Sequence, residues 1–251
     1  MSFPIDISEE AGVRFLHFGS SWVQGAMRIA KPYDLELEYT REMMASLLLH
    51  DDKHWPRKVL LIGLGAASLT KYLYRNHPLA HLTIVEIEPS VVAATRQFFK
   101  LPEDGKRIHM VIADGVEYMM GAEKNFDLIL VDGFNEHAHP GELNTLPFYQ
   151  ACRSRLSDTG VMAVNLLGLS RGVMGGFTHI LDAFDDRALM LPPCKSGNTI
   201  ALAVSGDAVS ISFDELKENV QTLNDETGLN LTPTLTRLFQ AKTCLNNQLT
   251  L

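Results

Sequence analysis

Short apolar runs alternate with stretches of helical periodicity from residue 57 onward. The run from Val59 to Ile62 ends at Gly63, and apolar residues at helical spacing follow it. Further apolar runs cover residues 82–85, 108–113, 126–131, 161–166 and 199–204. Helical patterns cover residues 90–100, 116–120, 148–156, 173–184, 213–223 and 235–241. Pro, Gly or Asp mark a loop at 133–147 and a turn at 158–160. This order predicts an α/β fold built on a doubly wound, mostly parallel sheet.

The first 56 residues follow a different pattern. Alternating residues from Val13 to Leu16 run into a Gly-Ser turn, and Trp22 to Ile29 reads as a second strand, which together predict a β-hairpin. From Tyr33 to Leu49, apolar residues recur at helical spacing with charges between them, as in an amphipathic helix. Trp55-Pro56 marks the junction with the rest of the chain. We therefore expect a short hairpin and helix over residues 1–56 and a Rossmann-like domain over residues 57–251.

A glycine turn and an acidic residue stand at the ends of the first two strands of that domain. Gly63 and Gly65 follow the run that ends at Ile62, and Glu86 ends the next run about 20 residues later. Glycine lets the backbone approach a ligand closely, and the helix start that follows offers free N–H groups. The carboxylate could accept hydrogen bonds from a nucleotide ribose. Glycines also end strands that bind nothing, so this interpretation depends on the order of strand, turn, helix and acidic strand.

Two further strands also end in carboxylates. Asp114-Gly115 follows the third strand, and Asp132 closes the buried strand that precedes it. Ligands sit at the carboxyl ends of strands in open α/β sheets, so Glu86, Asp114 and Asp132 are expected to share one site. The structural alternatives are an aspartate that caps a loop at Asp132, an ordinary Asp-Gly turn at Asp114, and at Glu86 an ordinary neighbour of the N-cap of the helix after Pro89.

Composition narrows the classes of function. The chain has 251 residues, a formal net charge of −8 and three cysteines. The acidic balance, without a cluster of Lys and Arg, argues against a nucleic-acid partner. The odd number of widely spaced cysteines predicts reduced thiols in a cytoplasmic protein. The N-terminus is acidic and no apolar run is long enough to span a bilayer, so we expect neither export nor a membrane partner. The short hairpin needs another surface to cover it, which predicts a homodimer.

A family resemblance becomes visible from these segments. The series VLLIGLGAAS, IVEIEP, ADG, FDLILVDGFN, PFYQACRSRLSDTGVMAV and SGNTIALAVSG resembles the catalytic domain of the spermidine synthase (polyamine aminopropyltransferase) family across about residues 57 to 205. The resemblance implies a sheet of the S-adenosylmethionine-methyltransferase type and no tightly bound cofactor. It also implies that the donor co-substrate is decarboxylated S-adenosylmethionine or S-adenosylmethionine.

The resemblance assigns roles to individual residues. It implies that Gly63, Gly65 and Glu86 hold the ribose and thioether side of the donor, and that Asp114-Gly115 binds the adenine. Asp132 would be the catalytic residue that serves the attacking amine of a small-molecule acceptor. A free alkylamine is mostly protonated at neutral pH, and a carboxylate at the mouth of the site can take its proton.

Three departures from the family pattern mark the chain as a divergent member. The aspartate of the family's glycine loop, which meets the amine tail of the donor, is replaced here by Ala66 or Ala67. The Asp-x-x-Asp motif ends in Asn135, which can hydrogen-bond an amine but carries no charge. The N-terminal β-domain is shortened, and residues 40–42 stand where its Tyr-His-Glu motif is expected.

Other functions remain open beside a spermidine-synthase-like aminopropyltransferase. An S-adenosylmethionine-dependent small-molecule methyltransferase uses the same fold, and a non-catalytic nucleoside-binding protein would tolerate the departures. A nicotinamide dehydrogenase fits least, because no second domain with a hydride-transfer constellation follows. His137 and His139, beside Glu136 and Glu142, invite a metal interpretation, but this short motif in a proline-containing loop is more typical of a solvated surface, and no metal is expected.

Overall fold

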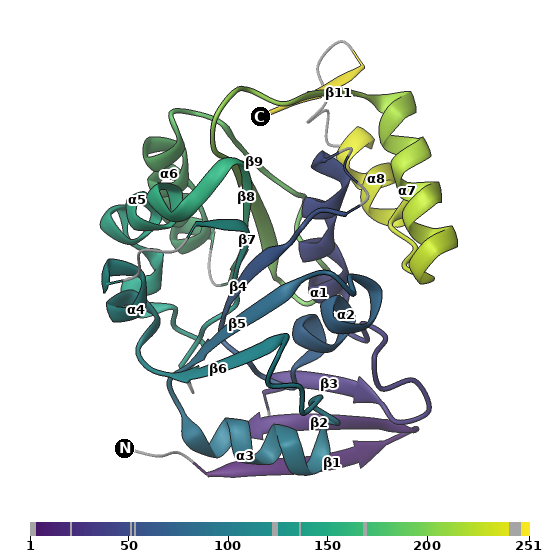
Figure 1. Cartoon of the computed structure of the whole chain (residues 1–251), viewed down its shortest axis with the longest axis vertical. Coiled ribbons are helices and arrows are strands. Elements are labelled where there is room, and N and C mark those ends of the chain that lie inside the picture. The colour runs from purple at the N-terminus through teal and green to yellow at the C-terminus, as the bar shows by residue number, and fades with distance from the viewer. Residues whose placement is uncertain are drawn as a thin grey trace.

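The computed structural model of the chain (Figure 1) describes residues 4–20, 22–50, 52, 54–121, 125–135, 137–167, 170–240 and 247–251, with backbone alone at 170, 171 and 240. A seven-stranded sheet in the order β6-β5-β4-β7-β8-β10-β9 forms its centre. The strands are β4 (Lys58–Ile62), β5 (His81–Glu86), β6 (Ile108–Ile112), β7 (Phe126–Val131), β8 (Leu156–Leu166), β9 (Ala188–Met190) and β10 (Thr199–Val204). Strands β4 to β8 pair in parallel and β10 is antiparallel to both its neighbours, which confirms the predicted mostly parallel sheet.

Helices cover both faces of this sheet (Figure 1). They are α2 (Ser68–Asn76), α3 (Pro89–Phe98), α4 (Gly115–Gly121), α5 (Leu146–Arg155), α6 (Ser170–Phe184), α7 (Phe213–Thr227) and α8 (Thr232–Gln240). Val59 and Leu61 of β4 belong to one hydrophobic core, and Leu60 and Ile62 belong to the core on the other face. A strand that is buried on both sides needs an unbroken apolar run, which is why β4 shows no alternation in the sequence. No helix among the described residues has the length and apolar character needed to cross a membrane.

The predicted N-terminal hairpin is present but has a third strand. β2 (Val13–Phe18) pairs with β3 (Gly25–Arg28), and β1 (Ile5–Glu10) pairs with the other edge of β2. Ile5 and Ile7 of β1 pack against the main core while the acidic residues between and after them face solvent. The alternation of apolar and polar residues that is typical of a strand covers only the start of this acidic segment, so β1 was not predicted from the sequence.

Several element boundaries differ from the predictions. The helix expected from Tyr33 to Leu49 is reduced to α1 (Glu38–Met43) followed by the 3₁₀ helix η1 (Met44–Leu49), because two successive turns occupy the chain from Arg28 to Asp34. The turn predicted at 158–160 lies inside β8, where a register shift against β7 absorbs it. The short η2 (Gly141–Asn144) lies inside the predicted loop, and the small ladder of β11 (Ser210–Ser212) with β12 (Gln248–Thr250) was not predicted.

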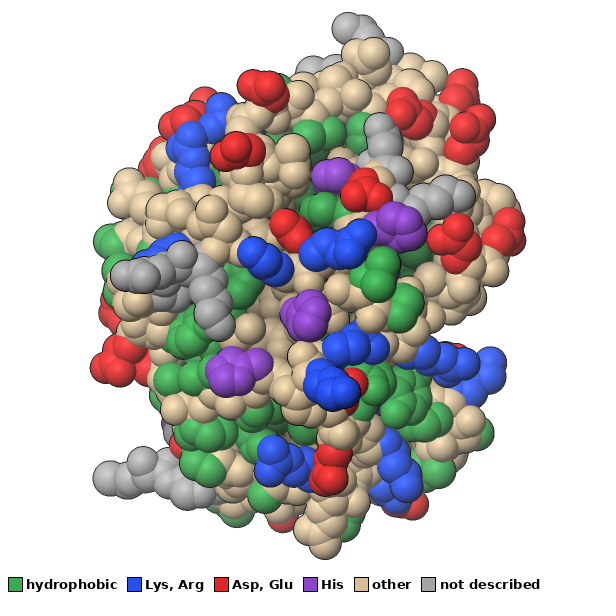
Figure 2. Space-filling view, in the orientation of Figure 1, with side chains coloured by type: hydrophobic (Ala, Val, Ile, Leu, Met, Phe, Trp, Pro, Cys, Tyr) green, Lys and Arg blue, Asp and Glu red, His purple; other side chains and the backbone are tan. Residues whose placement is uncertain are grey.

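Folding also gathers cations that are scattered along the chain. Arg57 and Lys58 stand at the start of β4, His81 opens β5, and Lys106 and Arg107 precede β6. Lys58 is the register partner of His81, whose ring bonds the Lys106 carbonyl group. Figure 2 shows Lys, Arg and His side chains gathered in the middle of one face of the molecule, with Asp and Glu mostly toward its margins. The expected absence of a basic cluster therefore holds for runs along the chain but not for neighbours across strands.

Candidate functional site

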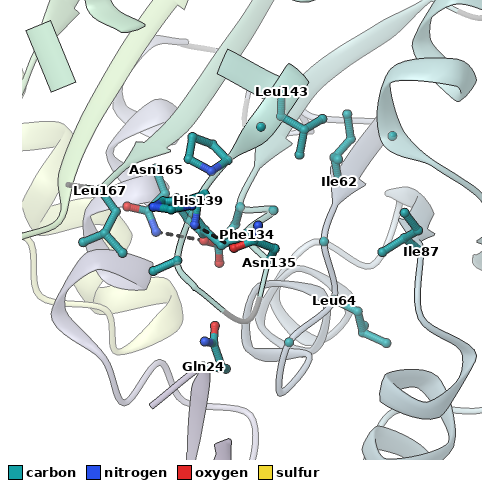
Figure 3. Close-up of a pocket in the computed structure, with 18 of the residues that line it drawn as sticks. Gln24, Ile62, Leu64, Ile87, Phe134, Asn135, His139, Leu143, Asn165 and Leu167 are labelled. Atoms are coloured by element: carbon teal, nitrogen blue, oxygen red, sulfur yellow. Dashed lines mark hydrogen bonds between the residues drawn. The ribbon is translucent and has the colours of Figure 1, made fainter. Parts of the chain in front are cut away.

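A pocket of about 650 Å³ opens at the carboxyl ends of β4, β5, β6 and β7. It is lined by every site residue predicted from the sequence: Gly63, Gly65, Glu86, Asp114, Gly115, Asp132 and Asn135. Figure 3 shows residues from these strand ends together with Gln24 and Leu167, which come from distant parts of the chain. The topology therefore brings the predicted residues into one cavity, as expected for parallel strands.

The glycine loop brings the end of β4 against the end of β7. Gly63 has a φ of 92°, and a Cβ added there would lie 2.2 Å from the carbonyl oxygen of Asp132. The Asp132 N–H donates to the Ile62 carbonyl at 2.9 Å, and the Gly63 N–H donates to Val85. Glycine at this position is thus required by a close approach between two backbones, which also sets where Asp132 stands.

Glu86 is tied to the same loop through its carboxylate. Oε2 accepts the Leu64 N–H at 2.9 Å, and Oε1 accepts the Glu88 N–H at 2.9 Å. Burial raises the pKa of Glu86, while these backbone donors favour its charged form. The carboxylate keeps a free lone pair that a hydroxyl group could use. Glu86 therefore lines the pocket and also bonds Glu88, which precedes α3, as the structural alternative expects; its tie to the glycine loop through Leu64 was not predicted.

Asp114 and Gly115 begin α4. Asp114 Oδ1 accepts the N–H groups of Val116 at 2.8 Å and Glu117 at 3.1 Å, which is an N-cap. A Cβ added to Gly115 would lie 2.6 Å from Cγ2 of Ile62, so a larger residue would force the Ile62 side chain to shift. The Asp-Gly pair therefore starts a helix rather than forming the turn that was its structural alternative, and it lines the pocket as well.

Asp132 stands at the centre of a side-chain hydrogen-bond chain. The Tyr39 hydroxyl donates to Oδ2 at 3.2 Å, and Asn165 Nδ2 donates to Oδ1 at 2.8 Å. Asn198 Nδ2 in turn donates to Asn165 Oδ1 at 3.0 Å. Burial raises the pKa of Asp132, and the two donors partly oppose that rise. Burial and the charge of Asp132 raise the pKa of Tyr39 well above its usual value, so its hydroxyl stays protonated as a donor.

Residues 40–42, where the Tyr-His-Glu motif is expected, lie beside the pocket-lining Tyr39 in α1 (Glu38–Met43). Thr40 donates to the Leu37 carbonyl, and Arg41 donates to the carbonyl groups of residues 35 and 36. Glu42 is buried and accepts the thiol of Cys194 at 3.0 Å. None of residues 40–42 lines the pocket, whereas Tyr39 does. The position of the motif at residues 40–42 stays a prediction, and the residue of α1 that lines the pocket is Tyr39. Tyr39, Asn165 and Asn198 were missed as site residues.

Asn135 shapes its own loop. Its Oδ1 accepts the N–H groups of His137 and His139, both at 2.9 Å, and its backbone N–H donates to the His139 carbonyl at 3.0 Å. Both lone pairs of the amide oxygen are thus used, which leaves the NH₂ group as the free end. The prediction that Asn135 hydrogen-bonds an amine therefore depends on this NH₂ group, which can donate to the lone pair of a neutral amine.

The histidines of that loop do not form a metal centre among the described residues. The rings of His137 and His139 are 6.4 Å apart, and no group of three or more His, Cys, Asp or Glu within the described residues could hold an ion. Glu136, which was weighed with them, lies outside the described residues.

Both alanines of the glycine loop are buried. Ala67 has a φ of 55° just before α2, and Ala66 is covered by strand β3. A Cβ added to Gly25 of β3 would lie 2.6 Å from the Ala66 Cβ. The neighbouring Gln24 lines the pocket, and Figure 3 shows its amide directed toward the centre of the site. The loop thus presents no carboxylate of its own to a ligand.

The sequence of the chain is similar to those of known polyamine aminopropyltransferases. The family model for the spermine/spermidine synthase domain matches residues 37–165. A polyamine aminopropyltransferase of Chromobacterium violaceum is 34% identical over 236 residues, which cover 94% of this chain and 89% of the relative. One from Neisseria meningitidis serogroup A is 35% identical over 228 residues, which cover 90% of this chain and 86% of the relative.

Solved structures show the same fold. A spermidine synthase in complex with the transition-state analogue AdoDATO has a TM-score of 0.67 and 23% identity, covering 93% of this chain and 84% of its own. Human methyltransferase-like protein 13 in complex with SAH has a TM-score of 0.70 and 24% identity, covering 76% of this chain and 93% of its own. At these identities the likeness concerns the fold, which is shared by both reaction types.

Proposed function

This chain belongs to the spermine/spermidine synthase family, and we propose that its pocket transfers the aminopropyl group of decarboxylated S-adenosylmethionine to the nitrogen of a small amine. It is a spermidine-synthase-like aminopropyltransferase and therefore an enzyme. The observation that carries the proposal is the Asp132 carboxylate, held by Tyr39 and Asn165 inside the pocket that Glu86 and Asp114 also line.

The donor occupies the half of the pocket built by β4, β5 and β6. The ribose hydroxyls donate to the Glu86 carboxylate, and the backbone of Gly63 and Gly65 lies along the thioether side. The adenine binds beside Asp114-Gly115, where Ile62, Ile87 and Leu143 supply apolar surface. The spermidine synthase that resembles this chain was solved with a transition-state analogue, which supports an aminopropyl donor here.

The reaction is an in-line displacement. The lone pair of a neutral amine forms a bond to the carbon next to the sulfonium, the C–S bond breaks with its electron pair going to sulfur, and methylthioadenosine leaves as a neutral thioether. Asp132 receives the proton that the amine must lose. Its raised pKa makes it a better proton acceptor than an exposed aspartate, and the Tyr39 and Asn165 donors fix the direction of its free lone pairs.

The direct test is chromatographic detection of methylthioadenosine formed from the decarboxylated donor with putrescine, cadaverine and spermidine. Product with at least one amine supports the proposal. Methylthioadenosine bound calorimetrically but never formed would contradict it. S-Adenosylhomocysteine formed from S-adenosylmethionine would instead favour methyl transfer. This alternative stays open because the glycine loop has buried alanines where the family has a carboxylate that meets the amine tail of the donor.

We also propose that the protein is a homodimer. β1 pairs with β2 alone among the described strands, so its outer edge carries backbone donors and acceptors that a second copy could use. Light scattering should give twice the chain mass across a range of concentrations. A monomer mass that does not change with concentration would contradict this.

A further inference from the structure

The pocket has two halves of different chemistry. Ile87 and Leu64 stand on one side of it, and Asn165 and Leu167 stand on the other, with Gln24 below them (Figure 3). The first side is the donor half of the proposed function. The second side, beyond Asp132, is where the body of the acceptor amine must lie.

Carboxylates are distributed unevenly between these halves. The described acidic residues that line the pocket are Glu86, Glu88, Asp114, Asp132 and Glu142. The first three follow β5 and β6 on the donor side. Glu142 belongs to η2, whose Leu143 packs close to Gly115 and Gly133, so it also stands with the donor half. Asp132 is thus the one carboxylate of the described lining that faces the acceptor half, and transfer requires it at the reacting nitrogen.

The amides that lie nearest to Asp132 in the acceptor half carry no charge. Asn165 and Asn198 are buried, and each amide oxygen accepts a hydrogen bond, from Asn198 and from the Ser196 hydroxyl at 2.7 Å. Asn135 uses both lone pairs of its amide oxygen on the loop and offers only N–H groups, which repel a cation. A distal ammonium of a diamine would find no counter-charge among these residues.

Apolar surface is available where a counter-charge is missing. Trp22 and Val23 line the pocket from the β2–β3 connection and are 58% and 45% exposed. Leu167 lines it from the end of β8. A hydrocarbon chain laid against these side chains would remove their apolar surface from water, which is favourable in proportion to the area covered.

We infer that the acceptor is an amine with one nitrogen, at the reacting position, and a neutral, largely apolar remainder. This inference rests on the proposed function and deepens it. A second carboxylate in the motif would pair with a distal ammonium, which this acceptor does not have. The replacement of that carboxylate by Asn135 and the exposed apolar surface of Trp22 and Val23 therefore favour the same kind of acceptor.

Putrescine and pentylamine make a matched pair of probes, because they have equal numbers of heavy atoms and differ in having an ammonium or a methyl group at the far end. We expect kcat/KM for pentylamine to exceed that for putrescine by about tenfold or more, the scale of a charge-assisted contact. Asn135→Asp should shift the ratio toward putrescine by about tenfold, since a carboxylate keeps both loop hydrogen bonds and replaces the NH₂ group with an oxygen.

Two further variants test the apolar half. Trp22→Ala should lower kcat/KM for pentylamine more than for putrescine, whereas Met120→Ala, equally exposed but outside the pocket, should leave both unchanged. A parent enzyme that prefers putrescine would overturn this inference while leaving aminopropyl transfer intact. No product from either amine, with methylthioadenosine still bound, would remove the proposed function and this inference with it.

Discussion

The donor and acceptor halves of the pocket are assembled in different ways. In the donor half, Glu86 and Asp114 bond the main chain of their own neighbourhood, and Gly63 is set by backbone contact. In the acceptor half, Tyr39 and Asn198 reach Asp132 and Asn165 across long separations in sequence, by contacts between side chains. The donor half is therefore held by contacts with the backbone, while the acceptor half depends on side chains from several elements meeting one another.

The largest effect is expected where the two halves meet. Asp132→Asn should lower aminopropyl turnover by at least about a hundredfold, because an amide cannot accept the proton of the amine. Methylthioadenosine affinity should be unchanged, since the amide has nearly the same shape. Turnover is measured by product chromatography and affinity by calorimetry. Retained turnover in this variant would show that another group takes the proton.

In the donor half, Glu86→Ala should damage both binding and folding. The lost contact with ribose should weaken nucleoside binding by about 1.5–3 kcal/mol, roughly tenfold to a hundredfold. The Leu64 and Glu88 N–H groups also lose their acceptor, so the melting temperature should fall. Glu117→Ala on the exposed side of α4 is the control for both measurements. An unchanged affinity for the nucleoside would show that Glu86 does not bind the ribose.

In the acceptor half, Tyr39→Phe should move the pH dependence. The Tyr39 hydroxyl favours the charged form of Asp132, so its removal raises the pKa of Asp132 further. Because the carboxylate is the active form, the acid limb of kcat/KM should shift to higher pH. Tyr118→Phe, outside the pocket, should leave the limb where it is. A shift to lower pH would mean that Tyr39 does not act through this hydrogen bond.

The smallest effect is expected at the end of the chain of amides. Asn198→Ala removes the donor that orients Asn165, at a cost of about 0.5–1.5 kcal/mol, or about twofold to tenfold in kcat. KM for the donor should not change, because Asn198 lies away from that half. Ser196→Ala, one hydrogen bond further out, should have a smaller effect than Asn198→Ala. A larger effect of Ser196→Ala would show that this series of hydrogen bonds does not orient Asn165 and Asp132.

The same contrast explains what the sequence could predict. Gly63, Gly65, Glu86, Asp114 and Asp132 each follow a strand whose apolar run is unmistakable, so their common edge follows from the order of elements. Their second roles, as loop ties and caps, depend on which N–H groups lie within reach, and only the folded chain shows that.

The residues of the acceptor half carry no such local signal. In α1, successive side chains are rotated by about 100°, so Tyr39 lines the pocket while its neighbours at 40–42 do not, and the sequence alone did not indicate which of them would. Asn165 sits inside a buried strand and Asn198 before another, where each looks like an isolated polar residue. Their function becomes apparent only when β8 and β10 are paired.

The contact between Gly25 and Ala66 has a consequence for how such a pocket can change over generations. Ala66 packs directly on β3, since a methyl group added to Gly25 would lie 2.6 Å from the Ala66 Cβ. If Ala66 rather than Ala67 holds the position of the lost acidic residue, a longer side chain there has to leave this contact, and the N-terminal sheet takes part in the change. The order in which the substitutions arise decides which specificities remain reachable.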